Sequence, residues 1–165
     1  MFELAIKGWS LDKDLQIIQA DVLMTVDDSV IVEEPLCIDV GLPALLASTM
    51  QNTSPNRFAP ADRWEQMPFF VCGCGDPECR GFSFVVEHLS DEQLQLTYVE
   101  ERSNGTYREL ESYVIPSEEY RKQIAAIGDT YLKFISTLDY RPYFQDTVPI
   151  VESLVQQIHL KLRSE

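Results

Sequence analysis

The chain has 165 residues, of which 45% are hydrophobic, so it is long enough to bury a sizeable core within one domain. Its 27 acidic residues outnumber 13 basic ones and give a formal net charge of −14 at pH 7. Nucleic acids and anionic membranes are bound mainly through lysine and arginine, so we expect neither as a partner. The acidity instead favours a partner protein with a basic surface, or it serves solubility alone.

The chain carries no recognisable targeting or membrane segment. No stretch reaches the roughly 20 apolar residues of a membrane span, and residues 1–14 lack the basic and apolar regions of a signal peptide. We therefore expect a cytoplasmic protein. Because thiols in that compartment stay reduced, the sequence predicts free cysteines rather than a structural disulfide.

Two β-like runs, at residues 15–26 and 30–40, flank an Asp-Asp-Ser turn and predict a hairpin. Alternation along the second run places Cys37 on the face opposite its two sequence neighbours. Residues 42–51 predict a short helix with a proline in its first turn. Residues 52–64 are polar and contain two prolines, which is typical of a long loop.

The middle of the chain predicts an antiparallel meander. Four β-like runs follow one another with short connections, at residues 67–74, 82–89, 93–101 and 107–115. Asn104-Gly105 lies between the last two runs and is a strong hairpin signal, because both residues tolerate a positive φ.

The last third predicts two amphipathic helices. The first begins after Pro116 with Ser117 as its N-cap, and the second begins near Thr147. The aromatic segment 139–146 between them is expected to cap the hydrophobic core. Together the elements predict a single α+β domain over residues 1–165. Its antiparallel β-sheet combines the N-terminal hairpin with the central meander, and the two C-terminal helices pack on one face.

The segment Val71–Gly81, VCGCGDPECRG, holds three of the four cysteines. Residues two apart at a strand end point to the same side, so we expect Cys72 and Cys74 to face the same way. A turn that starts at Asp76 should return the chain and bring Cys79 toward them. Three converging thiols suit tetrahedral zinc, whose Zn–S bonds are about 2.3 Å long.

A zinc ion would need a fourth ligand, for which His88, Cys37 and Asp76 are the candidates. His88 is the nearest imidazole in sequence, although the following strand carries it away unless that strand bends. The predicted metal-site residues are Cys72, Cys74, Cys79 and His88. Two other interpretations stay open: a redox-active thiol pair, and a tight turn in which small cysteine side chains only fill space.

The run C-G-C-G-D-P-E-C-R-G, followed by an apolar strand and then LQLTYV, resembles a motif of small, poorly characterised bacterial proteins. In that motif C-x-C-G-x3-C-G precedes two strands, the second with an aromatic residue. Here Arg80 is interposed, so Gly81 falls one residue later than in the pattern. The resemblance covers roughly residues 71–99 and implies a cytosolic bacterial protein, without implying an activity or a ligand.

The sequence contains no dinucleotide fingerprint, P-loop, zincin motif or nucleophile elbow, which favours a non-enzymatic role. The leading hypothesis is a protein-binding module with an acidic surface, in one version an immunity-type protein that neutralises a basic toxin domain. The alternative is a zinc-binding domain with a structural or regulatory metal at the cysteine turn.

Overall fold

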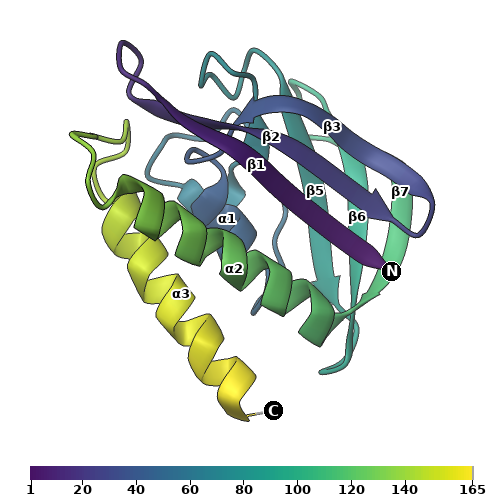
Figure 1. Ribbon diagram of the computed structural model, residues 1–165. Helices are drawn as coiled ribbons and strands as arrows, with labels where there is room; N and C mark the ends of the chain where they lie inside the picture. Colours follow the sequence, from purple (N-terminus) through teal and green to yellow (C-terminus); the bar gives the residue numbers. More distant parts are fainter. Residues whose placement is uncertain (165) are drawn as a thin grey trace.

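The computed structural model of the protein describes residues 1–164 and contains one seven-stranded antiparallel sheet, whose strands lie side by side in sequence order (Figure 1). The strands are β1 (Phe2–Asp12), β2 (Ile17–Val26), β3 (Ser29–Cys37), β4 (Phe70–Val71), β5 (Gly81–His88), β6 (Gln93–Glu101) and β7 (Tyr107–Pro116). The helices are α1 (Leu42–Ala47), the 3₁₀ helix η1 (Trp64–Gln66), α2 (Ser117–Ile135) and α3 (Thr147–Ser164). The predicted α+β fold is confirmed.

The helices form two layers on the sheet. α2 packs against β1 and β7, while α3 packs on α1 and α2 (Figure 1). α2 also covers the free edge of β1, because the Gln123 amide accepts a hydrogen bond from Leu4 N at 2.8 Å and donates one to Phe2 O at 2.6 Å. These hydrogen bonds occupy backbone groups at the start of the β1 edge.

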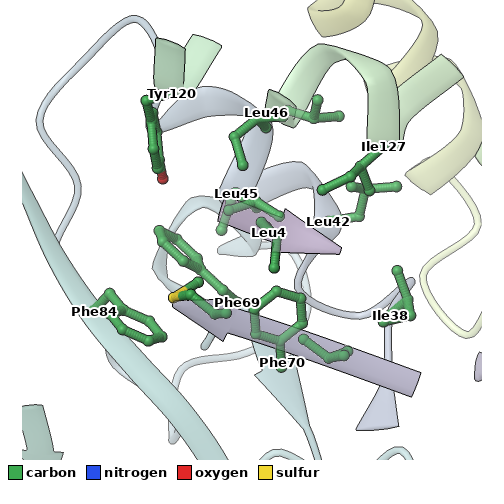
Figure 2. Packing of buried hydrophobic residues seen from close by; sticks show 14 of the residues in the cluster. Leu4, Ile38, Leu42, Leu45, Leu46, Phe69, Phe70, Phe84, Tyr120 and Ile127 are labelled. Carbon is green, nitrogen blue, oxygen red and sulfur yellow. The ribbon is translucent and has the colours of Figure 1, made fainter. Parts of the chain in front are cut away.

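The hydrophobic core lies between the sheet and the helices. Figure 2 shows Leu42, Leu45 and Leu46 of α1 within this core, with Leu42 beside Ile127 of α2. The helices approach closely at one glycine of α2, since a Cβ at Gly128 would lie 2.4 Å from Val155 Cγ2 of α3. Packing of this density fixes the helices firmly on the sheet.

Three local features differ from the sequence predictions. β1 was not predicted as a strand. β4 is only Phe70–Val71, much shorter than the predicted run 67–74. The predicted N-cap was also wrong: Pro116 is the N-cap of α2, and the Ser117 hydroxyl is buried without a hydrogen-bond partner among the described residues.

In the part of the chain that the structure describes, no helix combines the length and the apolar character needed to cross a membrane.

Candidate metal centre

The segment Cys72–Arg80, called the cysteine loop below, is closed by three backbone hydrogen bonds. Cys72 N donates to Arg80 O at 2.7 Å, across the base of the loop. Within the loop, Gly75 N donates to Cys72 O at 2.8 Å and Cys79 N donates to Asp76 O at 3.1 Å. The predicted turn at Asp76 is therefore present, and it returns the chain toward its start.

This closure brings the three thiols of the loop together. The sulfur atoms of Cys72, Cys74 and Cys79 all lie within 4.8 Å of one another. Tetrahedral zinc with Zn–S bonds of about 2.3 Å holds its sulfur ligands about 3.8 Å apart. The three thiols therefore lie close enough to bind a metal ion after a small inward movement. Cys74 and Cys79 are exposed and Cys72 is half-buried, so an ion can reach the cluster from solvent.

The three thiols differ in acidity because they donate hydrogen bonds to one another. The pKa of Cys72 is lowered, chiefly because the backbone N–H of Cys74 donates to its sulfur, and further because both neighbouring thiols do so. The pKa of Cys79 is raised to about 11, because its thiol donates to Cys72 and Cys74 and negative charge there disfavours a second thiolate. The arrangement therefore favours one thiolate at Cys72, which is the form that ligates metal or reacts as a nucleophile.

Two side chains of β2, Ile17 and Gln19, contact the backbone of the cysteine loop. Gly75 has φ = +80°, a conformation that side-chain-bearing residues rarely adopt, and a Cβ there would lie 3.0 Å from Ile17 Cγ2. The Gln19 amide donates a hydrogen bond to Gly73 O. These contacts fix the backbone of the loop on the sheet, so the thiols are presented by a supported turn.

Arg80 fastens the far end of the loop to β3. Its guanidinium forms an ion pair with the Glu34 carboxylate at 2.7 Å and lies 5.2 Å from the centre of the Phe82 ring. The positive charge of Arg80 also contributes to the lowered pKa of Cys72, although less than the hydrogen bonds do.

The other predicted ligands lie elsewhere. His88 is at the far end of β5, where its Nε2 lies 2.8 Å from Ser48 O, and it is not part of the cluster that the structure brings together. Asp76 Oδ1 accepts a hydrogen bond from Glu78 N at 2.9 Å, inside the turn. Among residues 1–164, the metal-sized cluster at the loop therefore consists of three thiols.

Cys37, the remaining cysteine, is buried at the end of β3 in a small apolar pocket with Ile17 and Val71. Its Sγ donates to Asp39 Oδ1 at 3.1 Å. Burial raises the pKa of the Cys37 thiol well above its ordinary value, and the nearby Asp39 carboxylate adds to that effect. Cys37 is thus an inert, structural thiol.

A cleft of about 650 Å³ lies beside the cysteine loop, and residues 74–78 form part of its wall. The cleft was not predicted from the sequence, and Asp39, Arg57 and Trp64 also line it. Asp39 is buried and accepts a hydrogen bond from Tyr140 at 2.6 Å. Two features of the sequence bear on the cleft: the long loop 52–64 and the aromatic segment 139–146 both contribute residues to it.

Comparison of the chain with protein-family models, with curated proteins and with solved structures finds no match. The chemistry of the cysteine loop and its surroundings is therefore the basis for a functional proposal.

Proposed function

We propose that the protein binds a soft divalent metal ion, zinc foremost, through the thiolates of Cys72, Cys74 and Cys79. The single observation that carries the proposal is the convergence of three sulfur atoms within 4.8 Å on an exposed, backbone-closed loop. Thiolate ligands select zinc and other soft ions over magnesium and calcium, which prefer oxygen.

The fourth coordination position is open in this proposal. Cys37 is buried and its thiol donates a hydrogen bond to Asp39. His88 Nε2 lies at hydrogen-bond distance from Ser48 O. A water molecule or an external group is then the fourth ligand, as in zinc sites that keep one exchangeable position. The cysteine loop lies outside the main hydrophobic core, so a bound metal would act on what the loop contacts rather than drive folding.

The proposal is tested by the metal content of protein purified without an affinity tag. We expect about one zinc ion per chain, with Cys74→Ser reducing the metal content severely. Cys37→Ser is the matched control, because it removes a thiol that lies outside the cluster, and it should keep its metal. A Cys74→Ser protein that is folded and retains full metal content would refute the site.

A second proposal, binding of a basic protein partner, is favoured by the exposed strand at the end of the sheet. Residues 107–112 of β7 are exposed, with Glu109 and Glu111 among them. An unpaired strand edge can accept a strand from a partner, and the acidic side chains favour a basic one, as in an immunity-type protein.

This second proposal predicts a partner that is retained at low salt and released at high salt. The double variant Glu109→Lys and Glu111→Lys should lose that partner, while Cys74→Ser should keep it. Failure to retain any partner at low salt would count against it.

A further inference from the structure

Five separate segments meet around the cleft beside the cysteine loop. They are the start of β2 with the turn before it (residues 15–17), the segment 39–43 between β3 and α1, the loop 57–67, the cysteine loop at 74–78, and the connection 142–147. Figure 1 shows the β1–β2 turn and the α2–α3 connection on the same side of the molecule. The meeting of segments from five parts of the chain at one place is typical of a ligand site on a rigid scaffold.

The walls of the cleft are largely apolar and aromatic. Trp64, Met67 and Phe144 line it, and two aromatic side chains at its lining, Phe58 and Tyr143, are 40% and 86% exposed. A volume of about 650 Å³ lies within the range of about 300–1,000 Å³ that small-molecule sites occupy. The shape and lining therefore suit a small molecule with an apolar body.

Arg57 supplies the cation of the cleft lining. The Glu101 carboxylate accepts a hydrogen bond from the backbone N–H of Arg57 at 2.9 Å. The Nε of Arg57 is buried and has no hydrogen-bond partner among the described residues, and its guanidinium carbon lies 5.0 Å from the centre of the Phe58 ring. Within residues 1–164, no acidic side chain forms an ion pair with Arg57. A guanidinium that lines the cleft without an ion-pair partner favours a bound carboxylate.

The acidic side chains that line the cleft either have hydrogen-bond partners within the protein or belong to the cysteine loop. Asp39 is engaged by Tyr140 and Cys37, while Asp76 and Glu78 belong to the cysteine loop. Two carboxylates on the loop disfavour a ligand with several negative charges, such as a phosphate dianion. A single carboxylate is both less repelled and geometrically matched to a guanidinium.

We infer that the cleft binds a small molecule with an apolar or aromatic body and one carboxylate, which Arg57 recognises. The aromatic lining receives the body of the ligand, and the carboxylate pairs with the Arg57 guanidinium. The inference goes beyond the metal site and does not require it, although the two sites share the wall formed by residues 74–78.

The test uses 3-phenylpropanoate and, as the matched neutral probe, 3-phenylpropan-1-ol. The chain has two tryptophans, and Trp64 lines the cleft, so Trp9→Phe leaves Trp64 as the single indole reporter of binding. Calorimetric titration of the unaltered chain provides a second readout. We expect the carboxylate to shift Trp64 emission and to bind about tenfold or more tightly than the alcohol, as a charge-assisted hydrogen bond implies.

Arg57→Gln should reduce the affinity for the carboxylate about tenfold and leave the affinity for the alcohol unchanged. Arg63→Gln is the control, since Arg63 belongs to the same loop, is exposed and does not line the cleft. Arg57→Lys keeps the charge and should retain part of the preference, which guards against a folding defect in Arg57→Gln.

Equal affinity for the two probes, no binding of either, or full carboxylate affinity in a folded Arg57→Gln protein would overturn the inference. Zinc-free Cys74→Ser separates the two proposals, because it should lose metal and still bind the carboxylate.

Discussion

The cysteines of this chain lie in two regions whose surroundings shift the pKa of the thiol in opposite directions. Cys37 is fully buried among apolar residues, where burial and a carboxylate raise its pKa. The thiols of the cysteine loop lie at the surface, where a backbone N–H lowers the pKa of Cys72. The surroundings of a thiol, rather than the presence of a cysteine, therefore decide whether it can serve as a ligand.

The greatest change in stability is expected when a glycine of each region is replaced by alanine. In the buried region, a Cβ at Gly41 would lie 2.1 Å from Pro68 O and 2.2 Å from Phe69 O, and backbone atoms cannot move aside cheaply. Gly41→Ala should therefore lower the free energy of unfolding by about 3 kcal/mol or more. Denaturant unfolding followed by circular dichroism measures the change.

Gly73→Ala is the matched substitution in the cysteine loop. A Cβ there meets only Gln19 Nε2, at 3.4 Å, which is an ordinary contact distance. We expect its stability to change by less than about 1 kcal/mol. Equal destabilisation by the two variants would show that the backbone around Gly73 is packed as tightly as that around Gly41.

The next effect is the pH dependence of metal binding. Cys79, with a pKa of about 11, is protonated at neutral pH and must lose its proton to ligate zinc. If zinc binding releases one proton, the affinity falls about tenfold for each unit by which the pH is lowered. Zinc affinity should therefore drop by about 100-fold or more from pH 8 to pH 6. Competition with a chelator of known pH dependence measures this slope.

The two histidines of the chain provide the control for that titration. His159→Gln and His88→Gln should leave both the slope and the affinity unchanged, because neither ring belongs to the thiol cluster. A pH-independent affinity would contradict the thiolate site, and lost affinity in His88→Gln would restore His88 as the fourth ligand.

A smaller effect separates the thiols within the metal-free loop. The pKa of Cys79 is raised to about 11 and that of Cys72 is lowered, so Cys79 has the smaller thiolate fraction at neutral pH. The greater intrinsic nucleophilicity of the Cys79 thiolate offsets only part of this difference. Iodoacetamide should therefore alkylate Cys72 severalfold faster than Cys79, as peptide mass spectrometry can measure.

Cys37 completes the comparison in the same experiment. Because it is buried, it should react only when the protein unfolds, and adding denaturant should release it. Alkylation of Cys37 at the rate of Cys72 in folded protein would contradict the contrast between the two regions.

The smallest effect concerns Arg80, which links the loop to β3. Its ion pair with Glu34 is partly exposed, and such pairs contribute about 0–1 kcal/mol. Arg80→Gln should lower stability by less than about 1 kcal/mol and slow the alkylation of Cys72 slightly, because a positive charge beside the thiolate is lost. An unchanged rate would mean that hydrogen bonds alone set the acidity of Cys72.

Much of the fold could be predicted from local sequence patterns. The meander follows from period-two alternation and its turns, and α3 begins at Thr147 as expected. β1 was harder, because the alternation of Phe2, Leu4 and Ile6 is broken near Gly8, where φ is +67° and the pairing register shifts. Serine is a common N-cap residue, but Ser117 is the first residue of α2 itself and is buried there.

The candidate site was predictable where it is local and not where it joins distant segments. Cys72, Cys74 and Cys79 lie within eight residues, so turn chemistry alone indicated their convergence. The cleft depends on contacts such as that between Asp39 and Tyr140, which are 101 residues apart in sequence. No local pattern encodes such a pairing, because it arises only when the α2–α3 connection packs against the end of β3.

X-ray absorption at the zinc edge, on protein loaded with one equivalent of zinc, shows whether three thiolates of the cysteine loop hold one metal ion. We expect about three sulfur ligands at about 2.3 Å and one lighter ligand. A first shell made only of oxygen and nitrogen, or a spectrum unchanged in Cys74→Ser, would contradict this expectation.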